Sequence, residues 1–185
     1  MNTRAWHAAA CALAMALGAP AALASASAPA ELQGRLPAAT LSGEATLSFW
    51  GFSVYTARLW VAPGFQANDY SNHAFALELT YLRAFSSQDI TRRSIEEMRR
   101  QPGAAQAPLT SWEAALRAAI PNVRKGDRLV GVYRPGEGAT FLANGKVTST
   151  LQDPAFARLF FGIWLAPETS ELPMRAALLG RPAAR

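Results

Sequence analysis

Residues 128 to 151 carry two turn signals that divide them into three short strands. The first turn is Pro135-Gly136-Glu137-Gly138 and the second is Asn144-Gly145. Asn-Gly is the strongest short signal for a β-hairpin, because both central residues of a type I′ turn need positive φ. The sequence therefore predicts an antiparallel meander, which excludes a chain built from helices alone. Its expected strands cover residues 128–134, 139–143 and 146–151.

Three further strands are predicted earlier in the chain. From Leu41 to Phe49 the apolar residues fall at odd positions with polar residues between them, which is the period of a strand with one face in water. A strand rich in aromatic and β-branched residues follows over 52–61 and ends at a Pro-Gly turn. We expect these two strands to pair as an antiparallel hairpin. Alternating large apolar residues predict the third strand over 75–82.

Helix end signals predict four helices, over about 87–100, 110–120, 154–165 and 169–179. Thr110 and Glu113 are spaced as a capping box at the start of the second helix. Asp153 precedes Pro154 as an N-cap for the third helix, whose apolar surface is too large for a solvated helix. We expect that helix to pack on the sheet or to line a pocket. Strands and helices together predict a single α+β domain, with the four tryptophans after residue 26 interpreted mainly as core residues: Trp50, Trp60, Trp112 and Trp164.

The first residues are typical of a secretory signal peptide. One positive charge, Arg4, precedes an uncharged alanine-rich stretch that ends in small residues suited to signal peptidase. We expect residues 1–26 to be removed by cleavage after Ala26 or Ala28, which leaves one domain over 27–185 without a transmembrane segment. The expected location is the periplasm or the exterior of the cell.

Cleavage would also remove Cys11, so the mature chain would have no disulfide and no thiolate metal site. His73 would be its only histidine, which excludes a histidine metal cluster and offers a poor basis for a catalytic triad. No cofactor is predicted. The net charge of +5 is spread along the chain and does not indicate nucleic-acid binding.

Charged and tyrosine side chains provide the candidate sites. Arg58 stands within an apolar strand, and an unpaired buried cation is prohibitively costly. Arg58 therefore lies either on a solvated sheet face or in a cavity where it meets a carboxylate of the protein or of a ligand. The same choice between a solvated sheet face and a cavity applies to the tyrosines of the predicted strands, Tyr55, Tyr81 and Tyr133. Glu96 and Glu97 lie near four arginines at helical spacing, which favours a solvated, ion-paired helix face.

Four segments carry a resemblance to a known family: residues 49–60 (FWGFSVYTARLW), 90–97 (ITRRSIEE), 126–129 (GDRL) and 160–165 (FFGIWL). In these segments the chain resembles the bacterial chalcone isomerase-like proteins, from about Ala39 to Gly180. The resemblance implies an open-faced β-sandwich, a large antiparallel sheet covered by helices with a ligand cleft between them.

The resemblance also implies that plant-type catalysis is absent. Plant chalcone isomerases close a flavanone ring with an arginine, a threonine, a tyrosine and an asparagine. The last three positions fall here on Trp50, Ile90 and Glu97, and none matches. Arg35 lies near the position of the arginine but out of register.

In other lineages the same fold resembles a fatty-acid-binding protein, in which an arginine and a tyrosine hold the carboxylate. Tyr55 and Arg58 adjoin the matching motif, but their spacing places them on opposite faces of a strand. Our leading hypothesis is a protein that binds a small amphipathic molecule such as a fatty acid. The alternatives are an isomerase or lyase with a different residue set, and a structural or partner-binding protein of the cell envelope. The candidate ligand-binding residues are Arg58, Tyr55, Trp50, Tyr81 and Tyr133.

Overall fold

The computed structural model describes residues 27–180, so the expected signal peptide lies outside the described residues. Six strands form one antiparallel sheet in which each strand pairs with the next along the chain. The α+β class and the predicted meander are confirmed. The strands are β1 (Thr40–Phe49), β2 (Phe52–Val61), β3 (Phe75–Tyr81), β4 (Arg128–Arg134), β5 (Gly138–Ala143) and β6 (Lys146–Leu151).

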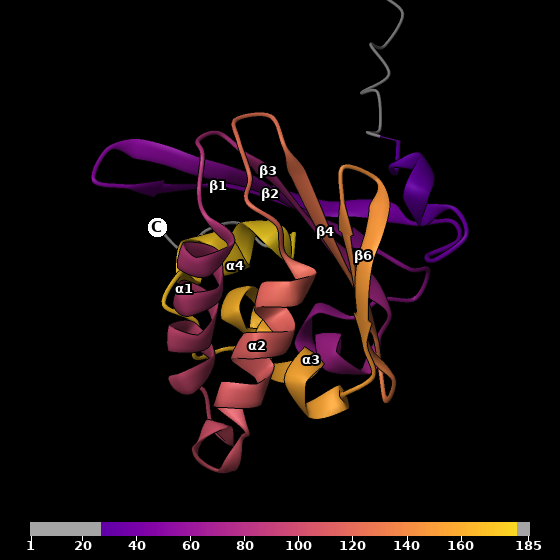
Figure 1. Ribbon diagram of the computed structural model, residues 1–185. Coiled ribbons are helices and arrows are strands. Elements are labelled where there is room, and N and C mark those ends of the chain that lie inside the picture. Colours follow the sequence, from indigo (N-terminus) through magenta and orange to yellow (C-terminus); the bar gives the residue numbers. More distant parts are fainter. Residues whose placement is uncertain (1–26, 181–185) are drawn as a thin grey trace, which may run out of the picture.

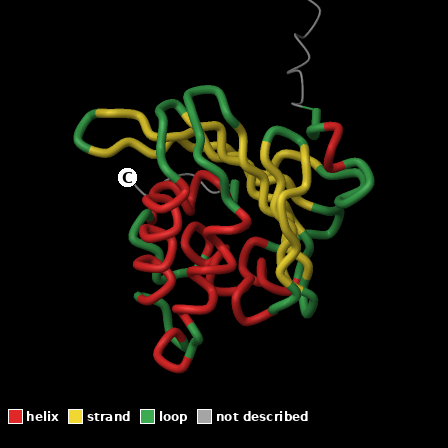
Figure 2. The backbone as a smooth tube through the Cα atoms, viewed as in Figure 1, coloured by secondary structure: helices red, strands yellow, loops and turns green. Residues whose placement is uncertain are grey.

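Four α-helices lie against one face of this sheet (Figures 1 and 2). They are α1 (Ser87–Arg99), α2 (Leu109–Ala119), α3 (Pro154–Leu165) and α4 (Leu172–Leu178), and the short 3-10 turns are η1 (Ala30–Leu32), η2 (Ala67–Asn72) and η3 (Ala104–Gln106). Ser86 caps α1 by accepting a hydrogen bond from Asp89 N, and Asp153 caps α3 in the same way from Phe156 N. Over residues 27–180, none of the helices has the length and apolar character needed to cross a bilayer.

Two helix starts differ from the prediction. The capping box at Thr110 is wrong, because α2 already begins at Leu109 and a residue inside the helix does not act as its N-cap. The fourth helix begins at Leu172 rather than Thr169. The Thr169 hydroxyl donates to Ile163 O at 2.6 Å and accepts from Glu171 N at 3.1 Å. These bonds hold the chain in a turn at the end of α3 and delay the next helix.

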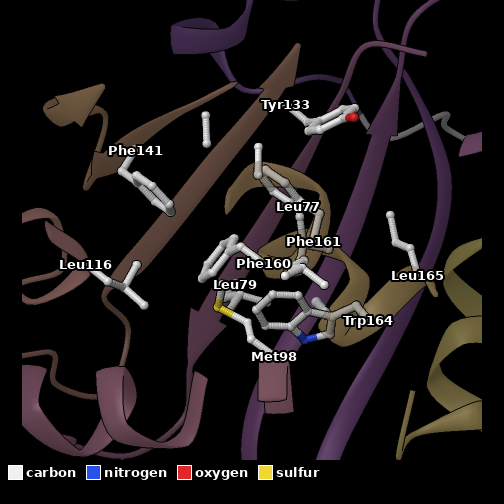
Figure 3. Packing of buried hydrophobic residues seen from close by; sticks show 14 of the residues in the cluster. Leu77, Leu79, Met98, Leu116, Tyr133, Phe141, Phe160, Phe161, Trp164 and Leu165 are labelled. Atoms are coloured by element: carbon white, nitrogen blue, oxygen red, sulfur yellow. The ribbon is translucent and has the colours of Figure 1, made fainter. Parts of the chain in front are cut away.

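The main core lies between the sheet and α3, where aromatic rings pack edge to face (Figure 3). The ring of Phe161 lies 5.1 Å from that of Phe75 and 5.4 Å from that of Tyr133, measured between centroids. Beneath it, a Cβ atom at Gly131 would lie 2.9 Å from the Phe161 ring. The missing side chain in β4 therefore lets α3 approach the sheet closely.

A smaller apolar cluster covers the opposite face of the sheet under the N-terminal segment. Leu32 and Leu36 pack there against Trp60. The Trp60 indole donates to the buried carboxylate of Glu78 at 2.7 Å, and Arg128 lies 3.9 Å from the same carboxylate. This face is therefore the outer side of the sheet, and the four helices cover the inner side.

We expect Gly43→Ala to lower the free energy of unfolding by about 2 kcal/mol or more, in the range for overpacking a core. A Cβ atom at Gly43 would lie only 1.9 Å from the carbonyl oxygen of Ala177, so α4 would have to move away from β1. Chemical denaturation measures the effect. Gly34→Ala is the matched control, because nothing lies within 4 Å of a Cβ atom there. Equal stability of the two variants would contradict the close fit of α4 on β1.

Candidate functional site

A cleft of about 620 Å³ lies between the sheet and the helices. This volume falls within the roughly 300–1,000 Å³ typical of small-molecule sites. Figure 3 shows Leu77, Leu79, Phe160 and Trp164 between the two layers that form the cleft. Most of the lining is apolar and comes from all layers of the fold: Leu47, Phe49, Val54, Leu77, Leu79, Phe85, Ile90, Ala119, Ile120, Leu129, Phe141, Phe160, Phe161, Ile163 and Trp164.

Polar side chains from α1 and from the turn after α3 also line the cleft. We call this set the polar rim: Asp89, Arg92, Arg93, Ser94, Glu97, Ser170 and Glu171. Asp89, Arg93 and Glu97 lie four residues apart, so they follow one side of α1. The rim therefore gives an otherwise apolar cleft a charged edge.

Most charges of the polar rim are paired within the protein. Arg92 lies 2.9 Å from Asp89, and Arg93 lies 2.6 Å from Glu97 and 3.5 Å from Glu96. The prediction of ion pairs on this helix is confirmed. The prediction of a solvated face is wrong for Glu97, whose side chain is only 7% exposed, because α1 turns it inward to meet Ser170.

Two tyrosines that the sequence offered as candidates, Tyr55 and Tyr81, line the cleft side by side. Their ring centroids are 5.8 Å apart, and the Tyr55 hydroxyl accepts a hydrogen bond from Trp164 Nε1 at 2.9 Å. Burial raises the pKa of Tyr55 and of Tyr81 above the ordinary value of 10.0, so both phenols are protonated at neutral pH. They present neutral hydroxyl groups to the cleft.

Trp50 and Tyr133 are outside the cleft lining. Trp50 is 85% exposed at the turn between β1 and β2, so its interpretation as a core residue is wrong. The turn requires positive φ at Trp50 and Gly51, which directs the indole away from the core. Tyr133 is buried in the main core, stacks on Phe75 at 4.8 Å and donates to Ser71 O at 2.8 Å.

Arg58 lies on the outer sheet face and is also absent from the cleft lining. It forms an ion pair with Glu44 on the neighbouring strand, and both side chains are about two-fifths exposed, at 41% and 44%. The hydrogen bond to Glu44 raises the pKa of Arg58. Of the alternatives for Arg58, the structure thus supports a partly solvated sheet face, on which the side chain pairs with a carboxylate of the protein. A ligand in the cleft would meet Tyr55 and not Arg58.

Three further residues line the cleft although none was among the candidate binding residues: Glu97, Glu171 and Trp164. A signal existed for Glu97, because it follows Ile90 and Ser94 at helical spacing and so belongs to the inward stripe of α1. Trp164 was predicted to be core, and it is buried, but its indole also reaches Tyr55 at the cleft. Nothing in the local sequence around Glu171 indicates that it faces α1.

One antiparallel sheet and helices on one face define an open-faced β-sandwich with an apolar cleft between its layers. The family described as chalcone isomerase-like matches this chain over residues 22–180, and the chain belongs to that family. The predicted resemblance is therefore confirmed.

Two similar proteins extend this comparison. An uncharacterized protein of Haemophilus influenzae is 28% identical over 137 residues, which cover 71% of this chain and 64% of that protein. The chain thus spans just under two thirds of that relative. The crystal structure of a fatty-acid binding protein of Arabidopsis thaliana superposes with a TM-score of 0.58 at 10% identity, covering 77% of this chain and 87% of that one. At this identity the likeness shows the fold alone.

We predict that Arg58→Met changes the free energy of unfolding by less than about 1 kcal/mol, the size typical of an exposed ion pair. The substitution removes the pair with Glu44 but keeps most of the apolar stem. Because Arg58 lies outside the cleft lining, ligand affinity should stay unchanged. Thermal denaturation and a binding titration measure the two quantities. A large loss of affinity with normal stability would restore Arg58 as a ligand anchor.

Proposed function

We propose that this protein binds a small amphipathic molecule, such as a fatty acid or a related lipid, in the cleft between the sheet and the helices. The observation that carries the proposal is a cleft of about 620 Å³ with an apolar lining and a charged rim. An apolar tail gains free energy from burial in such a lining, roughly 0.8 kcal/mol for each CH₂ group. The rim offers polar partners for the other end of the molecule.

The similar fold of the Arabidopsis protein, which is described as a fatty-acid binding protein, supports this proposal. The proposed function does not include the ring closure of the plant chalcone isomerases. The positions of their threonine, tyrosine and asparagine are occupied here by Trp50, Ile90 and Glu97. Trp50 also lies at an exposed turn outside the cleft lining. We therefore propose binding without the catalysis of the plant enzymes.

Blocking the cleft tests this function. Ile90→Trp adds a bulky ring to a partly buried position that lines the cleft, so affinity for Nile red, a neutral apolar dye, should fall at least about tenfold, equivalent to roughly 1.4 kcal/mol. Fluorescence titration measures the affinity, and circular dichroism checks the fold. Gln88→Trp on the same helix is the matched control, because Gln88 is exposed and outside the lining. Equal dye binding by both variants would place the binding site elsewhere.

We further propose that the protein works in the periplasm or outside the cell. An uncharged stretch after Arg4 and the small residues up to Ala28 support export. The mature protein is expected to begin at Ser27 or Pro29 and to lack Cys11. N-terminal sequencing of the protein recovered from the periplasm measures this, and a mature chain that still reacts with a thiol reagent would contradict it.

A further inference from the structure

The polar rim carries more negative than positive groups. Its carboxylates are Asp89, Glu97 and Glu171, and its cations are Arg92 and Arg93. Each arginine is already paired with a carboxylate of the protein, whereas Glu171 has no ion pair among residues 27–180. A ligand carboxylate entering the cleft would therefore find no free cation and would face the uncompensated charge of Glu171.

Both carboxylate oxygens of Glu97 already have partners within the protein. Its Oε2 atom accepts from the Ser170 hydroxyl at 3.0 Å. Its Oε1 atom lies 2.6 Å from Arg93 Nη2 and 3.8 Å from Arg100 Nε, and it is too deeply buried for a ligand atom to touch. Glu171 has no partner of this kind among residues 27–180 and can accept a hydrogen bond, which a ligand hydroxyl donates and an ionised carboxylate does not.

The tyrosines provide the complementary donors. The Tyr55 oxygen accepts from Trp164, and within the described part of the chain its own O–H proton has no acceptor. The Tyr81 hydroxyl likewise makes no hydrogen bond with the described residues, although the side chain is buried at the cleft. Glu171, Arg93 and Glu97 are the charged groups whose field reaches Tyr55, so donors and acceptors belong to one region of the cleft.

We propose that the polar rim selects an uncharged hydroxyl head group, as in a long-chain alcohol, over the carboxylate of a fatty acid. A hydroxyl both donates and accepts, so it can donate to Glu171 on one side and accept from a tyrosine on the other. A carboxylate has acceptors only and adds a negative charge beside Glu171. The inference rests on the proposed function and narrows its ligand class.

The test compares decanol with decanoate as competitors of Nile red on the full mature protein at pH 8, where decanoate is ionised. Decanol is expected to displace the dye at a concentration at least about tenfold lower, the factor for one buried hydrogen-bonding group left without its partner. Equal or stronger competition by decanoate would overturn the head-group inference. Failure of Nile red and of both competitors to bind would overturn the proposed function itself.

A charge variant sharpens the comparison. Glu171→Gln removes the unpaired charge of the rim, so decanoate should gain at least about threefold in affinity relative to decanol. Glu168→Gln is the matched control, because it removes the same charge three residues earlier at an exposed position outside the cleft lining. An identical decanol preference in the unmodified protein and both variants would show that the rim charge does not select the head group.

Discussion

The close contact between Phe161 and β4 holds the helix layer to the sheet. Gly131 has no side chain to separate them, so the Phe161 ring rests on the strand and joins the rings of Phe75 and Tyr133. This contact fixes α3 against the middle of the sheet. Elsewhere the helices present small side chains to the sheet, such as Ser94 and Ala119, which do not fill the space between the layers. A cleft results because α3 packs tightly on the sheet at Phe161, whereas small residues such as Ser94 and Ala119 leave space between the layers.

Hydrogen bonds across the cleft keep its sides at a defined separation. The Trp164 indole joins α3 to Tyr55 on β2, and the Ser170 hydroxyl joins the turn after α3 to Glu97 on α1. The bond of Ser170 depends on the turn at Thr169, which stops the chain from continuing as a helix directly after α3. The same turn brings Glu171 to the rim. The short turn after α3 thus helps to position the helices and also brings polar side chains to the cleft.

The strands could be predicted because their signals are local. Asn144-Gly145 adopts positive φ at both residues, as its turn type requires, and the alternation before Phe49 marks β1. The start of α2 was mispredicted because Thr110 and Glu113 match a capping box by spacing alone, whereas the helix starts at Leu109. The cleft residues were only partly predictable. Strand period predicts that Tyr55 and Arg58 lie on opposite faces of β2, but not which face lines the cleft. The position of Glu171 at the cleft depends on tertiary packing that no local pattern records.

The buried position of Glu97 is better explained by the polarity that it gives the edge of the cleft than by stability. Exposed pairs such as Arg92 with Asp89 contribute about 0–1 kcal/mol, and α1 already has such a pair on its surface. Bringing a carboxylate into the protein costs several kcal/mol of hydration free energy, and well-packed apolar residues often stabilise a fold more than the ion pair they replace. Ser170 on Oε2 and Arg93 and Arg100 on Oε1 compensate part of that cost. An apolar residue at position 97 would close this edge of the cleft and pack against its neighbours. The carboxylate keeps the edge polar and holds Arg93 and Ser170 together beside the cleft.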